Sequence, residues 1–189
     1  MVGIGVNGGW RGAVARERAP TRGGVGAGHR RTPGLLQAVC VLVGALGVAG
    51  PAFAASPIPL AATDVAALVV PPEHGSKVLA LWSLDCAYCE ENLAALRAYQ
   101  RQHADVQLVY VATDPIAQRE TLEARLKAAK LDDVPSRAYA DATPDRLNFM
   151  IDPTWGGETP RTLVIHADGS RKALSGALTL ERITKLMTL

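Results

Sequence analysis

Two cysteines separated by two residues, Cys86 and Cys89, are the residues of this chain best suited to chemistry. Such a pair can cycle between dithiol and disulfide, form a structural disulfide, or supply half of a zinc site. Residues 55–189 contain no second cysteine pair, and their histidines, His74, His103 and His166, lack zinc-finger spacing. A disulfide that closes so small a loop restrains little of the unfolded chain. The spacing therefore favours a redox pair that needs no metal and no other cofactor.

The position of this pair supports the same interpretation. Residues 78–82 form a continuous apolar run of strand length, and from Cys86 onward Leu93, Leu96 and Tyr99 recur at helical spacing. The free N–H groups and the dipole of a helix N-terminus stabilise a thiolate and lower its pKa below the ordinary value of ~8.5. We expect Cys86 to be the nucleophile and Cys89, one turn on and more buried, to be the resolving thiol.

The remaining pattern predicts an α/β fold. We expect a Pro- and Ala-rich linker over residues 55–62 and a parallel pair of buried strands flanked by helices. An antiparallel hairpin and a final helix follow, which together indicate a three-layer α/β/α sandwich with a mixed central sheet. The predicted elements are a helix near Asp64–Val69 capped by Thr63, strands at 78–82, 106–112, 161–166 and 172–175, and helices at 86–103, from Asp114-Pro115 to about 130, at 144–150 and at 179–187, the last capped by Thr179.

The N-terminal quarter differs in composition from the rest. Residues 1–54 hold six Arg and one Glu, whereas residues 55–189 hold fourteen Lys or Arg and seventeen Asp or Glu. Residues 1–28 are rich in Gly and Arg, which predicts a disordered tail or a start assigned too far upstream. The acidic balance of the rest offers no basic field for nucleic acid, so we exclude that partner.

Residues 29–54 have the features of a secretory signal peptide. The basic pair Arg30-Arg31 precedes an apolar run at 35–49, and the small-residue site Ala-Phe-Ala at 52–54 follows. Cleavage there would remove Cys40 and leave an exported domain at 55–189, which indicates a periplasmic or other external location. The alternative is an uncleaved anchor formed by residues 35–54 that tethers the domain to the inner membrane.

Residues 81–89, LWSLDCAYC, resemble the active-site run of the thioredoxin superfamily, especially its exported reductases of the TlpA/ResA type. Residues 157–165, GETPRTLVI, resemble the family's loop and strand in which a cis-proline faces the disulfide. The resemblance implies a thioredoxin-like fold. It also implies that Pro160 is cis, that Thr159 offers its backbone to an extended client, and that Tyr88 and Trp155 contact substrate. From the sequence, Trp155 could be either an exposed contact or a buried residue of a lid.

Three departures from the family pattern bear on mechanism. Asp85 stands where a Trp is frequent, and its charge opposes a nearby thiolate, which favours a reductase. Tyr88 between the cysteines instead resembles exported oxidases and isomerases. Asn92 stands where many members carry a Glu that moves protons to the resolving cysteine, and Ala94 replaces a Pro. Glu158 is the candidate substitute for that proton relay.

The resemblance implies a thiol–disulfide oxidoreductase that acts on cysteine-containing exported proteins, more as a reductase than as an oxidase. Its clients could include apocytochrome c during cytochrome c maturation, and a membrane or periplasmic thiol protein would supply its electrons. The alternative is a copper metallochaperone that binds metal through the same two cysteines, because thiolates hold soft metals. Copper carriers of this fold usually add a His as third ligand, and the sequence gives His166 no obvious place in such a site. A binding module that has lost turnover is a third hypothesis.

Overall fold

The computed structural model describes residues 56–140 and 143–188. The predicted leader at 1–28, the signal peptide at 29–54 and the alternative anchor at 35–54 lie outside the described residues. Within the described ranges, no helix is long and apolar enough to cross a bilayer.

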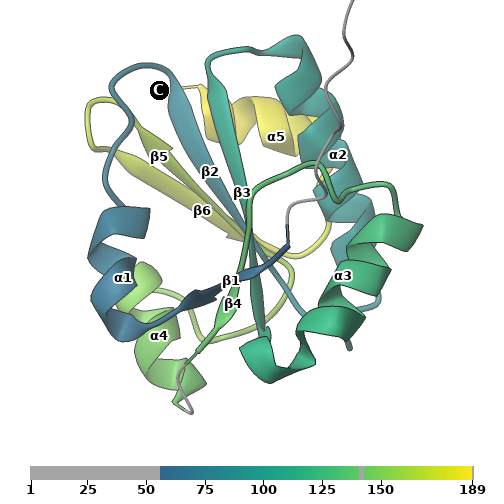
Figure 1. Cartoon of the computed structure of the whole chain (residues 1–189). Helices are drawn as coiled ribbons and strands as arrows, with labels where there is room; N and C mark the ends of the chain where they lie inside the picture. The colour runs from purple at the N-terminus through teal and green to yellow at the C-terminus, as the bar shows by residue number, and fades with distance from the viewer. Residues whose placement is uncertain (1–55, 141–142, 189) are drawn as a thin grey trace, which may run out of the picture. The chain divides into compact units, whose positions relative to one another are not determined.

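A six-stranded mixed sheet forms the centre of the domain, in the order β1-β4-β3-β2-β5-β6 (Figure 1). The strands β1, β4, β3 and β2 are mutually parallel, whereas β5 pairs antiparallel with β2, and β6 pairs antiparallel with β5. This confirms the predicted mixed sheet with parallel central strands and an antiparallel edge. The bounds are β1 Ile58–Leu60, β2 Ser76–Trp82, β3 Val106–Pro115, β4 Ser136–Tyr139, β5 Arg161–His166 and β6 Arg171–Ser175.

Helices cover both faces of this sheet and give the predicted three layers. Helices α2, α3 and α5 lie on one face and α1 and α4 on the other (Figure 1), and their apolar residues pack against the sheet in two separate core clusters. The strands serve both cores because side chains alternate: Tyr110 of β3 joins the first cluster and Val111 the second. The helices are α1 Ala62–Leu68, α2 Cys89–Gln102, α3 Arg119–Ala128, α4 Pro144–Ile151 and α5 Leu180–Met187, with a 3-10 turn η1 at Ile116–Gln118.

The C-terminal half agrees with the sequence prediction more closely than the N-terminal half. Strand β5 has the predicted bounds, the Asp168-Gly169 turn leads into β6, and Thr179 caps α5 by accepting the Arg182 N–H. The linker prediction for 55–62 is wrong, because Ile58–Leu60 forms β1 and pairs with β4. The cap prediction for α1 is also wrong: Asp64, rather than Thr63, accepts the Ala61 N–H at 2.9 Å.

Two predicted helix starts are displaced toward the C-terminus. Strand β3 continues to Pro115, and α3 begins only at Arg119 after η1. Asp114 does not cap a helix, because its carboxylate accepts the Leu84 N–H at 3.0 Å instead. Helix α2 begins at Cys89, so Cys86 lies in the turn that precedes the helix rather than at its first residue.

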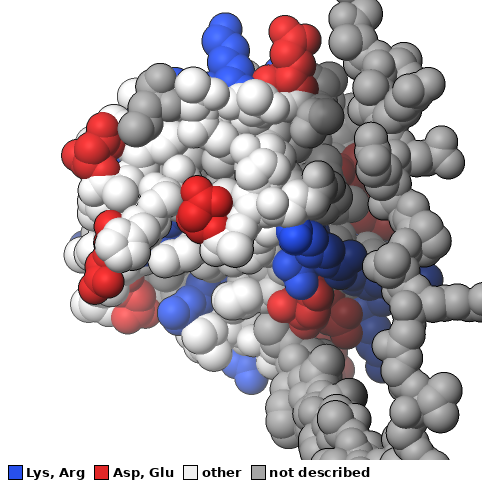
Figure 2. Space-filling view, turned by 90° about the horizontal axis from the view of Figure 1, so that it is seen from above, with Lys and Arg blue, Asp and Glu red and all other residues white. Residues whose placement is uncertain are grey.

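Lys, Arg, Asp and Glu are scattered over the end of the domain where β2 and β3 begin. Figure 2 shows this end from above, with both signs of charge around a largely uncharged centre. No single basic field forms among the described residues visible on this face.

Candidate redox site

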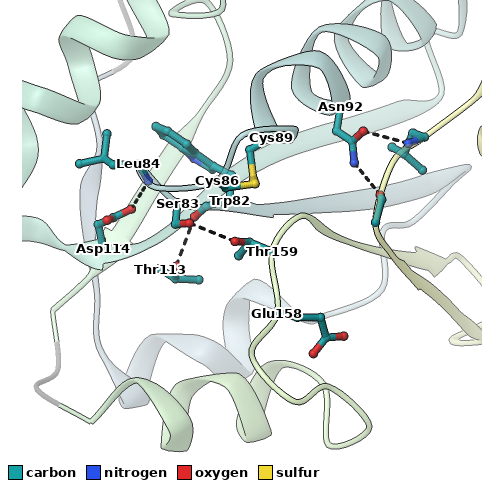
Figure 3. Close-up of a disulfide and its surroundings, with 12 residues drawn as sticks. Trp82, Ser83, Leu84, Cys86, Cys89, Asn92, Thr113, Asp114, Glu158 and Thr159 are labelled. Atoms are coloured by element: carbon teal, nitrogen blue, oxygen red, sulfur yellow. Dashed lines mark hydrogen bonds between the residues drawn. A yellow bond between two sulfur atoms is a disulfide. The ribbon is translucent and has the colours of Figure 1, made fainter.

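Cys86 and Cys89 form a disulfide directly after β2 (Figure 3). The Cys86 N–H donates to the Ser83 carbonyl and the Cys89 N–H to the Cys86 carbonyl, which folds the loop into consecutive turns. Cys89 is 1% exposed within the first core cluster, whereas Cys86 is half-buried. The exposure therefore has the order predicted for an accessible first thiol and a buried second thiol.

The loop before β5 reaches the disulfide loop from the neighbouring strand. Its Thr159–Pro160 bond is cis, as predicted. The side chains of Ser83 and Thr159 form a hydrogen bond of 3.0 Å, and Figure 3 shows Thr159 beside the disulfide loop. The sequence did not identify Ser83 as part of the site.

The antiparallel register of β2 and β5 explains this meeting of loops. Leu81 of β2 is paired with Arg161 of β5. Continuing that register by two residues sets Ser83 opposite Thr159, which agrees with their hydrogen bond. Sheet pairing thus brings together the segments that carry Cys86 and Pro160.

A buried ion pair closes the base of the proline loop. Arg161 contacts Asp152 at 2.6 Å, with side-chain exposures of 11% and 8%. Burial would raise the pKa of the Asp152 carboxyl, but hydrogen bonds from Arg161 and Thr154 outweigh burial and hold this pKa below its usual range. The pair joins the end of α4 to the start of β5 and so fixes the ends of the loop that carries Pro160.

Trp155 lies in the core beneath this loop rather than on its surface. It is 5% exposed in the second core cluster, and its indole N–H donates to the Glu158 carbonyl at 2.8 Å. Of the two interpretations left open by the sequence, the structure supports a buried residue that holds the loop. A residue so buried has little surface with which to contact a client.

Glu158 is poorly placed for the proposed proton relay. Its carboxylate accepts a hydrogen bond from the Ser175 hydroxyl, and Arg161 lies 3.9 Å away. The Ser175 hydrogen bond, aided by the Arg161 charge, lowers the pKa of Glu158. Figure 3 shows this carboxylate directed away from the disulfide. The geometry therefore gives the relay no support.

Asn92 connects the disulfide helix to the other side of the site. It is 4% exposed on α2, and its amide donates to the Gly176 carbonyl at 2.8 Å and accepts the Leu178 N–H at 2.9 Å. The Gly176 N–H in turn donates to the Pro160 carbonyl at 2.9 Å. At the position of the family's Glu, this chain thus has a neutral bridge from α2 to the residue that follows Thr159.

Two carboxylates lie next to the disulfide loop. Asp85 is exposed directly before Cys86, and Asp114 at the end of β3 accepts the Leu84 N–H. Burial raises the pKa of Asp114; the Leu84 hydrogen bond opposes this rise, and the nearby charge of Asp85 adds to it. Tyr88, between the cysteines, is 63% exposed and free to meet a partner.

His166 lies at the opposite end of the sheet from the cysteines. It is paired with Ser76 at the start of β2, whereas Cys86 follows the end of that strand. Its Nδ1 is 2.9 Å from the Ser76 hydroxyl. His166 is therefore not placed to be a third copper ligand beside the two sulfurs. Among the described residues, no cluster of three or more His, Cys, Asp or Glu could hold a metal ion.

Of the comparisons with known proteins, the one with solved structures bears on the architecture. No protein-family model and no curated protein sequence matches the chain. The structure resembles a thiol:disulfide interchange protein of the thioredoxin family from Chlorobium tepidum, with 16% identity over 65% of this chain and 81% of that one and a TM-score of 0.50. A thioredoxin-related protein from Neisseria meningitidis serogroup B matches with 20% identity over 61% and 84% of the two chains, at a TM-score of 0.49.

A secreted disulfide oxidoreductase from Mycobacterium tuberculosis matches with 16% identity over 60% of this chain and 80% of that one, at a TM-score of 0.48. At such identities the likeness concerns the fold. The order of strands, the helices on both faces and the Chlorobium structure together show that this chain has the thioredoxin-like fold.

Proposed function

We propose that this protein is a thiol–disulfide oxidoreductase that exchanges its Cys86–Cys89 disulfide with cysteines of exported proteins. The observation that carries the proposal is the unequal exposure of two bonded sulfurs at a strand–helix junction. A structural disulfide gains nothing from an accessible first sulfur beside a buried second one. Exchange chemistry needs both, because a client must reach one sulfur and the other must displace it.

The reaction transfers two electrons and two protons. In the reducing direction the Cys86 thiolate attacks a client disulfide, and a mixed disulfide forms while the first client sulfur leaves as a thiolate and takes a proton from solvent. Cys89 then loses its proton and attacks the Cys86 sulfur. The Cys86–Cys89 disulfide forms, the mixed disulfide breaks, and the second client sulfur leaves and is protonated.

Charges near the disulfide favour the reductase direction. The carboxylate of Asp85 repels a thiolate at Cys86, and Asp114 places a second carboxylate on the same loop through its hydrogen bond with the Leu84 N–H. Since these charges disfavour the thiolate, they destabilise the reduced protein relative to the disulfide. A couple with a destabilised reduced form has a more negative potential and donates electrons more readily.

The loop at Thr159–Pro160 is the proposed client-binding edge. Pro160 has no N–H to donate, so the loop leaves its edge open to an extended client segment that pairs with the Thr159 backbone. The exposed ring of Tyr88 provides an apolar contact on the other side of Cys86.

Export rests on the signal-peptide pattern of residues 29–54, with tethering by residues 35–54 as the alternative. One of the similar structures is described as secreted. We propose a periplasmic location, cysteine-containing exported clients such as apocytochrome c, and a membrane or periplasmic thiol protein as electron donor.

The deciding experiment is the reduction potential of the Cys86–Cys89 couple, measured by equilibration in defined thiol–disulfide buffers followed by alkylation. We expect a value near or below about −220 mV, toward the ~−270 mV of thioredoxin. A value near the ~−120 mV of strong exported oxidants would reverse the direction. If the Cys86–Cys89 couple does not exchange with small thiols, the proposed function is refuted. Stoichiometric copper(I) binding by a protein that does not exchange would favour the metallochaperone.

A further inference from the structure

The buried position of Cys89 raises the question of how its thiol loses a proton. Cys86 is accessible, but Cys89 is 1% exposed and must become a thiolate during resolution. Asn92 has no ionisable group, and its amide oxygen and nitrogen are hydrogen-bonded to Leu178 and Gly176. Any proton route from Cys89 must therefore use other groups that contact the sulfur from inside the domain.

A small cavity adjoins both cysteines. It has a volume of about 10 Å³ between the end of β2, the start of α2 and the end of α3. A buried site needs ~10–15 Å³ to admit one water, so this cavity has the size for a single molecule. Its lining includes Trp82, Cys86, Cys89, Glu90 and Arg125.

The indole N–H of Trp82 is a polar group without a hydrogen-bond partner among the described residues. Trp82 is 2% exposed and belongs to the same core cluster as Cys89. Figure 3 shows its ring beside the disulfide loop. A buried donor left unsatisfied is costly, and native proteins usually supply a partner, including ordered water.

We propose that Trp82 is a positioning residue that binds one water in this cavity, and that this water donates a hydrogen bond to the Cys89 thiolate during resolution. The inference rests on the proposed exchange function and deepens it. An indole N–H can only donate, so it occupies a lone pair of the water and leaves both water hydrogens free to donate. Water oriented in this way favours the thiolate over the thiol.

The same water provides the exit for the Cys89 proton. The ionisable groups that face the cavity are Cys86 beside Cys89, Glu90 on α2 and Arg125 on α3, and Glu90 is exposed to solvent. The Cys89 proton passes to the water and from there to solvent on the Glu90 side. The Cys89 thiolate then attacks the Cys86 sulfur and displaces the client thiolate. This is the two-electron exchange step of the proposed function.

The test measures the pKa of Cys89 in a Cys86→Ser background, where Cys89 is the thiol of the described domain. Alkylation rates across a pH series, read by mass spectrometry at Cys89, give this pKa for protein with and without Trp82→Phe. We expect Trp82→Phe to raise the Cys89 pKa by about one unit, a roughly tenfold smaller thiolate fraction at neutral pH. Trp155→Phe is the matched control, since it also removes a buried indole N–H but lies in the other core cluster.

An unchanged Cys89 pKa in folded Trp82→Phe, or an equal rise in Trp155→Phe, would overturn the proposal. Should Trp82→Phe not fold, a high-resolution crystal structure of the reduced wild-type protein decides, because it must show a water bonded to the Trp82 nitrogen. Both readouts are independent of client turnover. A protein that fails to exchange disulfides, yet shows this water and this pKa shift, would refute the proposed function but leave the assigned water and its effect on the Cys89 pKa standing.

Discussion

Replacing Asn92 with alanine tests whether the bridge between α2 and the proline loop stabilises the domain. The substitution removes the hydrogen bonds to the Gly176 carbonyl and the Leu178 N–H, at 2.8 and 2.9 Å. Both partners are backbone groups of the segment that joins β6 to α5. The methyl group of alanine cannot replace either bond, so both backbone groups lose their side-chain partner.

The size of the effect follows from burial. A buried donor or acceptor left unsatisfied costs ~1–3 kcal/mol, and Gly176 and its neighbours are only partly buried. Partial access to water places each group in the lower half of that range. We therefore expect Asn92→Ala to lower the free energy of unfolding by about 2–4 kcal/mol.

Urea unfolding of the oxidised protein at pH 7 measures this difference, with an unchanged m-value as the sign that both states keep their compactness. Gln102→Ala is the matched control, because Gln102 lies exposed on the same helix and should change stability by less than about 0.5 kcal/mol. A loss for Asn92→Ala no larger than that of the control would refute the reasoning.

Asn92→Asp adds a dependence on pH with a defined sign. The new carboxylate would face the Gly176 carbonyl in a buried site, so its folded-state pKa should rise above the unfolded value of ~3.9. The neutral acid can donate to that carbonyl and the carboxylate cannot. The stability of Asn92→Asp relative to wild type should therefore be greatest below pH ~4 and fall as the pH rises through the folded-state pKa. A stability that rises over this range, relative to wild type, would contradict the assigned bond.

Four further outcomes are expected. Cys86→Ser should abolish disulfide exchange, and Cys89→Ser should accumulate mixed disulfides with clients, both visible on non-reducing gels; preferential alkylation of Cys89 at low pH in reduced wild type would reverse these roles. Arg161→Met should cost about 3 kcal/mol in urea unfolding at pH 7, because it leaves the Asp152 carboxylate buried without its partner. Since the folded pKa of Asp152 is lowered, its contribution to wild-type stability is present above pH ~4 and lost as the pH falls through the folded-state pKa, a loss that Asp152→Asn should not show. Ser83→Ala should cost about 1 kcal/mol and raise the KM for a peptide disulfide, because it releases Thr159; an unchanged KM would show that this bond does not order the client edge.

Long, uninterrupted patterns made much of the fold predictable from sequence. Residues 78–82 and 161–166 are apolar runs bounded by turn residues, and each forms a strand of the central sheet. Strands β1 and β4 were missed because each has only three or four residues and gains stability from pairing with distant strands. Asp114-Pro115 has the residue types of a helix start, so the sequence predicts a helix there. In the folded protein the Asp114 carboxylate instead accepts a hydrogen bond from the Leu84 N–H, which is distant in the sequence.

The features of the site also fall into those that the sequence predicts and those that only the folded structure shows. The disulfide pair and its order of exposure were predicted from cysteine spacing and position, which are local signals, whereas the cis bond before Pro160 was predicted only from the resemblance to the thioredoxin superfamily. The contacts of Ser83, Asn92 and Arg161 were not, since each joins residues that only the folded sheet brings together. For Asn92 the one sequence signal was its departure from the family's Glu, which marked the position but not its role.

The two loops of the site lie together because of the register of β2 and β5, and side-chain contacts then fix them. Leu81 opposite Arg161 sets the end of one strand against the start of the other, and Ser83 and Thr159 meet two residues beyond. A slip of one residue would exchange the two buried faces of β5 and move Val164 into the core cluster of Leu163 and Ile165, so the side chains that select the register also select the meeting of the loops. Asn92 adds a second connection through Gly176 to Pro160, from the helix that carries Cys89. The position of the client edge relative to Cys86 is therefore determined from two sides, by the pairing of β2 with β5 and by helix α2.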